Sequence, residues 1–127
     1  MNTSLFTKEH FIEKIKSIPD ENWISDGQLV DMNHPEKGCI LYHLGVKDSL
    51  IINDEARALG IMLKSNVEKI ENHLSEPVYR RLYNHYDKEY QDTEYFLSDV
   101  ITCTNDSSPN LDMSPKEMFL KCLEVID

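Results

Sequence analysis

Cys39 and His43 are the two residues whose types and spacing point most directly to chemistry. They lie four positions apart in a segment typical of a short helix, so their side chains are expected to share one face. A thiol beside an imidazole begins a nucleophilic pair or a metal site, and cysteine catalysis would add an orienting group such as Asp106. No motif marks a strained nucleophile turn, and the spacing supplies no further metal ligands, so neither a metal site nor a cofactor is predicted. A buried thiol and a half-exposed imidazole without a catalytic role is the competing interpretation.

Four tyrosines, Tyr79, Tyr83, Tyr86 and Tyr90, form the second pattern. On a helix over residues 76–90 their side chains fall within an arc of about 60°. The other apolar residues of the segment are too few to hold a helix on a core, so we interpret the stripe as its packing face. Stacking on nucleic acid is disfavoured, because it needs a basic surround and this segment runs into the most acidic part of the chain.

The stripe leads to specific predictions of burial. We expect Tyr83 and Tyr86 to be largely buried against other helices. Tyr79 and Tyr90 are expected to be partly exposed at the two ends of the helix. Arg81 lies on the opposite side of the helix and is expected to face water.

Tyrosine and arginine next to an acid-rich surface are also typical of protein interfaces. The stretch from residue 87 to residue 99 is rich in Asp and Glu but lacks the spacing of a calcium-binding loop, so it reads as a solvated face. A protein partner is therefore expected, and its candidate contact residues are Tyr79, Tyr90, Arg80, Asp87, Asp92 and Glu94.

Charge narrows the classes of function. The chain of 127 residues has a net charge of −10, and residues 86–127 carry 10 acidic and 3 basic residues. Nucleic-acid binding relies on Lys and Arg, so direct binding is not expected. Mimicry of nucleic acid by the carboxylates is a minor alternative.

No apolar run approaches the roughly 20 residues that span a bilayer, and the first residues lack the pattern of a secretory signal. Three widely spaced cysteines suggest no disulfide framework, and we expect a cytoplasmic protein without membrane contact.

Capping signals and apolar stripes predict an all-α fold, a single domain over residues 1–127 with five to six short helices. Four helices begin at capping residues: Thr7, Asn53, Thr93 and Ser114. A small β-hairpin is a further expectation near residues 22–32, around Asp26-Gly27.

Two irregular segments complete the expected layout. Trp23 is expected to fold back onto the core and pin the loop that contains it. Residues 104–113 are expected to form a polar loop, in which Asn105 and Asp106 bond to nearby backbone.

The layout resembles a family of short uncharacterised bacterial and bacteriophage proteins with a W…G…C…G…ND pattern. The matching residues are Trp23, Gly27, Cys39 before "LYHLG", the stretch "EARAL", and "VITCTND" followed by a helix with an early glutamate. The chain departs from the family pattern at Tyr42 and Thr104. The resemblance implies a compact helical domain and no established activity.

Together these observations favour a non-enzymatic, acidic module that binds and regulates a protein partner. The resemblance adds an inhibitory, host-interaction role for a phage or mobile element as an expectation. A small enzyme built on Cys39, His43 and Asp106 is the alternative, and the oligomeric state stays open.

Overall fold

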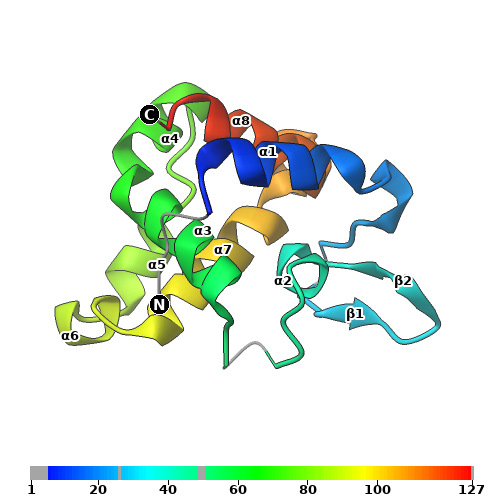
Figure 1. Cartoon of the computed structure of the whole chain (residues 1–127). Coiled ribbons are helices and arrows are strands. Elements are labelled where there is room, and N and C mark those ends of the chain that lie inside the picture. The colour runs from blue at the N-terminus through cyan, green and yellow to red at the C-terminus, as the bar shows by residue number, and fades with distance from the viewer. Residues whose placement is uncertain (1–5, 26, 49–50, 127) are drawn as a thin grey trace.

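Eight α-helices and one β-hairpin make up the described part of the chain, residues 6–25, 27–48 and 51–126 of the computed structural model (Figure 1). The helices are α1 (Lys8–Ser17), α2 (Ile40–His43), α3 (Asp54–Ser65), α4 (Val67–Leu74), α5 (Arg80–His85), α6 (Lys88–Gln91), α7 (Glu94–Asp106) and α8 (Pro115–Glu124). The hairpin strands are β1 (Val30–Asp31) and β2 (His34–Gly38), and two 3-10 turns are η2 (Asp20–Asn22) and η3 (Ser108–Leu111). The expectation of a mostly helical chain is confirmed, with a two-stranded antiparallel sheet added.

The hairpin lies later in the chain than the predicted residues 22–32. Its turn is at residues 32–33, where the Asp31 side chain accepts a hydrogen bond from the backbone N–H of Asn33 at 2.9 Å. Aspartate and asparagine favour such turns because their short side chains bond to backbone nearby. Trp23 forms an isolated bridge with Gly38, so the segment before β1 runs beside β2 as well. The hairpin is therefore correct in kind and displaced in position.

The helix count exceeds the predicted five to six because two long segments are broken. Asn66 separates α3 from α4, and its side chain donates a hydrogen bond to the carbonyl of Met62 at 2.8 Å. Tyr86 separates α5 from α6, because its backbone is extended (φ −107°, ψ 143°). Hydrophobic periodicity gives no sign of either break, since the apolar stripe continues across both.

The predicted helix starts are confirmed by their geometry. The side chains of Thr7, Asn53, Thr93 and Ser114 each accept a hydrogen bond from the N–H three residues on, at 3.2, 2.9, 3.4 and 3.1 Å. The first N–H groups of a helix lack partners within it, so such a cap stabilises it by about 1 kcal/mol. These capping contacts are local in sequence, which is why they could be predicted.

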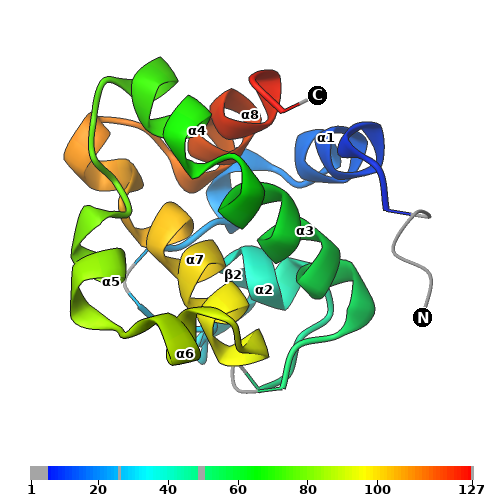
Figure 2. The ribbon, with the colours of Figure 1, turned by 90° about the vertical axis from the view of Figure 1, so that its left-hand side faces the viewer.

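Helix α7 lies at the centre of the array, as Figure 2 shows, and it packs against α2, α3, α5, α6 and α8. Its closest neighbour is α3, where Gly60 permits the approach. A Cβ atom at Gly60 would lie 2.9 Å from the Cβ of Leu97 and 3.2 Å from its carbonyl oxygen. The fully buried Phe96, Val100 and Ile101 face the same core.

Asn105 ties α7 to the loop that carries the hairpin. Its side-chain oxygen accepts from the N–H of Ile40, the first residue of α2, at 3.1 Å, and its amide donates to the carbonyl of Ile24 at 2.8 Å. The prediction that Asn105 and Asp106 begin a polar loop is wrong, because both belong to the last turn of α7. The helix continues because the buried Asn105 finds its partners in distant backbone rather than in a local turn.

Trp23 folds onto the core as expected. The side chain is only 7 % exposed, and its ring lies 6.4 Å from that of Phe119 and 5.1 Å from that of His43. The loop before the hairpin is therefore held between α2 and α8.

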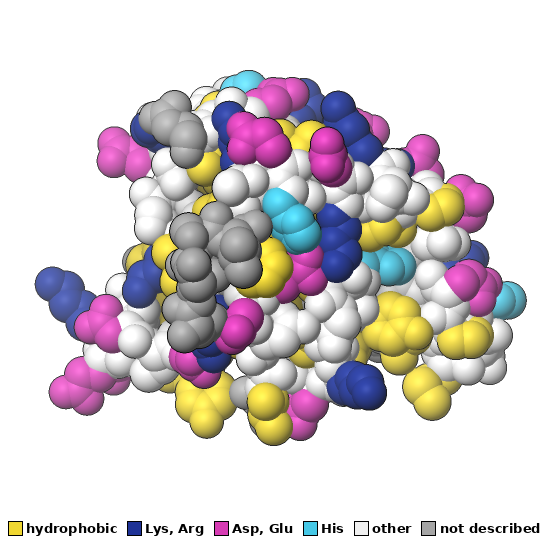
Figure 3. All heavy atoms as spheres, viewed as in Figure 1, with side chains coloured by type: hydrophobic (Ala, Val, Ile, Leu, Met, Phe, Trp, Pro, Cys, Tyr) yellow, Lys and Arg dark blue, Asp and Glu magenta, His cyan; other side chains and the backbone are white. Residues whose placement is uncertain are grey.

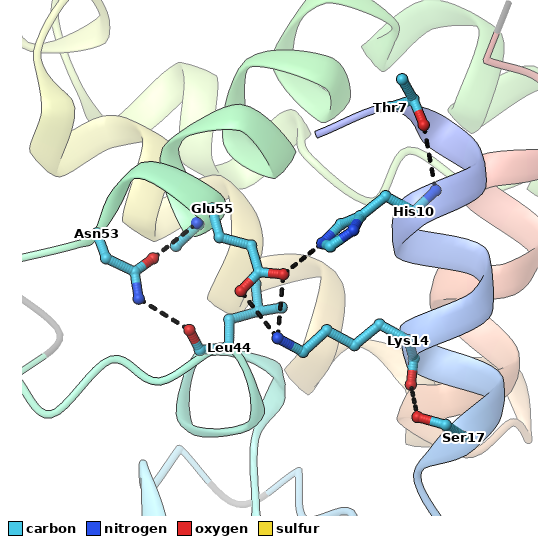
Figure 4. A network of polar contacts seen from close by, with 8 residues as sticks. Thr7, His10, Lys14, Ser17, Leu44, Asn53 and Glu55 are labelled. Atoms are coloured by element: carbon cyan, nitrogen blue, oxygen red, sulfur yellow. Dashed lines mark hydrogen bonds and ion pairs between the residues drawn. The ribbon is translucent and has the colours of Figure 1, made fainter. Parts of the chain in front are cut away.

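A polar cluster joins α1 to α3. Figure 4 shows His10 and Lys14 of α1 pointing toward Glu55 of α3. The ammonium group of Lys14 lies 2.9 and 3.0 Å from the two carboxylate oxygens, and the Glu55 side chain is 13 % exposed. Nearby, the Asn53 amide donates to the carbonyl of Leu44 at 2.8 Å, so the start of α3 is fixed to the end of α2.

Candidate functional site

The Cys39 and His43 pair does not have the arrangement of a catalytic dyad. Cys39 stands at the N-cap position before α2 and its side chain is 4 % exposed, while His43 is the last residue of that short helix. The Nε2 atom of His43 lies 2.8 Å from the carbonyl oxygen of Asn22, and the ring packs on Trp23. The imidazole therefore holds the loop before the hairpin.

The electrostatics of the pair also oppose nucleophilic chemistry. Burial raises the pKa of the Cys39 thiol, and the nearby carboxylate of Asp106 raises it further. Burial lowers the pKa of His43, although hydrogen bonds with the backbone of Asn22 and Gly38 oppose that shift. An activated cysteine needs a lowered pKa, so this thiol stays protonated and this imidazole stays neutral.

Tyr79 is the residue for which the sequence-based prediction is most clearly wrong. Its side chain is fully buried rather than partly exposed, and its hydroxyl lies 2.6 Å from that of Thr104. Its backbone N–H donates to the carboxylate of Glu71 at 2.9 Å. The residue precedes α5, so it does not continue the helical stripe, and the buried Thr104 hydroxyl gives its own hydroxyl a partner within the core. Tyr79 is therefore not a surface residue that a partner could contact.

The other three tyrosines surround Phe96 at the edge of the core. The ring centroids of Tyr83, Tyr86 and Tyr90 lie 5.1, 6.3 and 6.1 Å from that of Phe96. All three are half-buried, so the prediction that Tyr83 and Tyr86 are largely buried is wrong, while partial exposure of Tyr90 is confirmed. The single helix over residues 76–90 is absent, because the break at Tyr86 lets α6 fold back and stack Tyr90 on Tyr86 at 4.2 Å.

The remaining predicted contact residues are exposed but lie on different surfaces. Arg80 lines a hollow beside α4, whereas Asp92 and Glu94 line another beside α3. Glu94 forms an ion pair with Arg57 at 2.6 Å, and Asp87 caps α6 by accepting from the N–H of Tyr90. The structure does not bring these residues together as one site. Arg81 is exposed, as predicted.

One face of α7 forms the floor of two adjoining hollows. The small hollow of about 230 Å³ and the large hollow of about 620 Å³ share Asp99, Thr102 and Asp106 in their linings. These residues are spaced by three and four, so they fall within an arc of about 60° on the helix, opposite the face that packs on the core. We call the two hollows together the α7 groove.

The small hollow is bounded by the segment before β1 on one side and by tyrosine rings on the other. Its lining includes Leu29, Cys39, Tyr90 and Tyr95 besides the shared residues. The Tyr90 hydroxyl donates to the Asp99 carboxylate at 2.8 Å. Burial and this carboxylate raise the pKa of Tyr90 to about 12, so the hydroxyl remains a donor at neutral pH.

The large hollow lies between α7 and α5. Arg81, His85 and Tyr86 stand along its wall, and Cys103 lies on its floor beside the shared residues. The Cys103 thiol donates to the carbonyl of Val78 at 3.4 Å, and burial raises its pKa, so it is a further protonated thiol. Both hollows therefore contain the carboxylates of Asp99 and Asp106 and tyrosine rings, and the large hollow also contains the guanidinium group of Arg81.

The groove contains residues that the sequence did not single out, namely Tyr95, Thr102 and the segment before β1. The i, i+3, i+7 spacing of Asp99, Thr102 and Asp106 was a visible signal of one polar face on a helix. The wall formed by the segment before β1 was not visible, because that segment is more than 50 residues away from α7 in the sequence.

Comparison with protein-family models, with curated proteins and with solved structures gives no significant match. Membership of the family with the W…G…C…G…ND pattern accordingly stays a prediction. Over the described ranges, no helix is long and apolar enough to cross a membrane. Within the same ranges, no three His, Cys, Asp or Glu side chains are grouped so that they could hold a metal ion.

Proposed function

We propose that this protein is a non-enzymatic binding module and that the α7 groove is the surface that takes its protein partner. The observation that carries this proposal is the pair of adjoining hollows over one polar face of α7. The α7 residues in their linings run from Tyr95 to Asp106, a span that suits an extended or helical segment, because recognition of such segments uses grooves between secondary-structure elements. The half-buried tyrosine rings beside them are a side-chain type that is enriched where interfaces gain most of their binding energy.

Binding is favoured over catalysis by the state of the titratable groups. The thiols of Cys39 and Cys103 have raised pKa values. The carboxylates of the groove accept hydrogen bonds within the chain, Asp99 from Tyr90 and Asp106 from Asn105. A nucleophile needs an adjacent base and a lowered pKa, and His43 instead holds backbone. These features support a surface that recognises a partner rather than one that transforms a substrate.

Charge distribution disfavours the nucleic-acid mimic. On the face seen in Figure 3, Asp and Glu side chains are interspersed with Lys and Arg rather than gathered in one row. Several carboxylates are also paired with bases within the chain, for example Glu55 with Lys14 and Glu94 with Arg57. An inhibitory or regulatory role for a phage or mobile element rests on the family resemblance and forms part of the proposal, as does a cytoplasmic location, which rests on the sequence pattern of the first residues.

The test is affinity capture from the cell that makes the protein, followed by direct binding with the recovered partner. Thr102→Trp fills the floor that both hollows share, and Glu13→Trp adds the same ring to the exposed face of α1. We expect the Glu13→Trp protein to retain the partner and the Thr102→Trp protein to lose it. If the two variants have equal unfolding midpoints in urea, the loss of the partner comes from the changed surface and not from unfolding. A partner retained equally by both variants would contradict the groove assignment.

Thiol reactivity separates the enzyme alternative from this proposal. Iodoacetamide reacts with the thiolate, so Cys39 in the folded protein should be alkylated more slowly at pH 7.5 than Cys39 in the chain unfolded in urea. Mass spectrometry of the digested protein reports each cysteine separately. Faster alkylation in the folded state would mean an activated thiolate and would favour the enzyme.

A further inference from the structure

We propose that the small hollow of the α7 groove is a pocket for a cationic side chain, a lysine or an arginine of the bound partner. This assignment rests on the proposed function and adds the chemistry of the ligand to it. Among the described residues, the lining of this hollow includes Asp99 and Asp106 and neither lysine nor arginine. Two carboxylates in a hollow without a lining base attract a positive group, and the net charge of −10 attracts it from a distance.

Asp99 is held ready to accept a hydrogen bond from such a group. The Tyr90 hydroxyl donates to its Oδ2 atom at 2.8 Å and fixes the orientation of the carboxylate. A carboxylate has two oxygens and about four acceptor positions, so one donated hydrogen bond leaves capacity for an ammonium or guanidinium group. Asp99 is half-buried, and a charge-assisted hydrogen bond is stronger there than in open water.

The aromatic walls suit a cation as well. Tyr90 is fixed by its stacking on Tyr86 at 4.2 Å with an interplanar angle of 23°. Tyr95 lines the same hollow and is 53 % exposed, which makes it one of the large apolar side chains that the fold leaves in water. The positive group of a lysine or an arginine is attracted to the face of a tyrosine ring. Carboxylates together with aromatic faces recognise organic cations better than either does alone.

Size and position favour a side chain of a partner over a free small molecule. The volume of about 230 Å³ is below the roughly 300–1,000 Å³ typical of sites for drug-sized ligands. The small hollow shares Asp99, Thr102 and Asp106 with the large hollow, so a chain that inserts one side chain has room to continue along the groove. Arg81 lines that continuation, and its positive charge disfavours a cation there, so the cationic side chain is directed to the small hollow.

A matched pair of peptides tests this assignment. One is acetyl-Gly-Ser-Arg-Ser-Gly-amide, and the other has citrulline in place of arginine, which keeps the shape and removes the charge. NMR titration follows the ring signals of Tyr90 and Tyr95 and the backbone signal of Asp99. We expect saturable shifts with the arginine peptide and at least about tenfold weaker binding of the citrulline peptide, the loss of one charge-assisted hydrogen bond. Equal shifts with both peptides would overturn the assignment.

Two variants that each remove one negative charge provide the control. Asp99→Asn is expected to weaken binding of the arginine peptide by about tenfold. Glu13→Gln on the exposed face of α1 should leave the affinity for this peptide unchanged. A similar loss in both variants would mean general attraction to an acidic protein and would overturn the pocket. Titration with spermidine tests whether the pocket binds a free polyamine instead. Tighter binding of spermidine than of the arginine peptide would assign the pocket to a free polyamine and overturn its role in partner binding.

The two proposals can fail separately. If the Thr102→Trp protein loses its partner while both peptides bind alike, the groove binds a partner but the cation pocket is wrong. If the arginine peptide binds selectively while the Thr102→Trp protein keeps its partner, the small hollow binds a cation but does not serve the partner, and the groove assignment in the proposed function is wrong.

Discussion

Tyr79 and Tyr90 lie at the two ends of one tyrosine-rich segment and have opposite environments. Tyr79 is fully buried, and its hydroxyl pairs with the neutral hydroxyl of Thr104 on the inner side of α7. Tyr90 is half-buried, and its hydroxyl donates to the charged Asp99 on the outer side of the same helix. The two environments show that α7 separates two regions of the molecule: its inner face packs in the core, and its outer face forms the floor of the α7 groove.

Truncation of the two tyrosine rings is expected to have the largest effect on stability and to differ between the two positions. Tyr79→Ala should lower the free energy of unfolding by about 3–5 kcal/mol, because it removes a fully buried ring from the core. Tyr90→Ala should cost clearly less, since its ring is half in water and the groove beside it is open. Urea unfolding, followed by circular dichroism, measures both. A larger cost at Tyr90 than at Tyr79 would invert the assignment of the two faces.

A second prediction concerns the polar residue on the inner face. Asn105→Ala should cost about 1–3 kcal/mol, because the buried N–H of Ile40 loses its acceptor. The nearby Thr102→Ala on the outer face is the matched control and should change stability by less than about 0.5 kcal/mol. The urea midpoints of the two variants decide the matter, and equal midpoints would mean that Asn105 does not anchor α2.

Removal of one oxygen atom gives a finer comparison of the two hydroxyls. Tyr79→Phe should cost about 1–2 kcal/mol, because the buried Thr104 hydroxyl loses a partner, whereas Tyr90→Phe should cost about 0.5–1 kcal/mol. Both variants keep the ring, so packing is unchanged and only the hydrogen bond is tested. Thermal unfolding with matched samples gives the two differences. Tyr90→Phe should also weaken the arginine peptide, because Asp99 loses the group that orients it.

A smaller effect is expected for the pH dependence of stability. It concerns His43, which holds the loop before β1, one wall of the small hollow. The pKa of His43 is lowered by burial, so the unfolded chain takes up a proton at a higher pH than the folded protein does. The stability from neutral His43 is therefore complete above the unfolded pKa of about 6.5 and declines as pH falls through the folded value. Urea midpoints between pH 7.5 and pH 5.5 should decrease, and His43→Gln should reduce that dependence. A His43→Gln protein with an unchanged pH slope would contradict the assignment.

The features that could be predicted from the sequence are those whose causes lie within a few residues. The caps at Thr7, Asn53, Thr93 and Ser114 were predictable because each side chain bonds to backbone three residues on. The apolar stripes likewise identified the inner faces of the longer helices.

The features that could not be predicted depend on contacts between distant segments. The burial of Tyr79 depends on Thr104, 25 residues later, and the continuation of α7 through Asn105 depends on Ile24 and Ile40. The break at Tyr86 brings Tyr90 next to Asp99. Hydrophobic periodicity predicts neither the break nor this contact. For the candidate site, the polar face of α7 was visible in the sequence, while the wall formed by the distant segment before β1 was not.

Site-specific crosslinking reports whether the partner lies against the outer face of α7. The photoreactive residue p-benzoylphenylalanine replaces the exposed Tyr95 at the α7 groove in one protein and Glu13 on α1 in another. Illumination with the captured partner should give a covalent adduct from position 95 and none from position 13. An adduct from position 13 alone, or from both positions equally, would contradict the claim that the outer face of α7 is the binding surface.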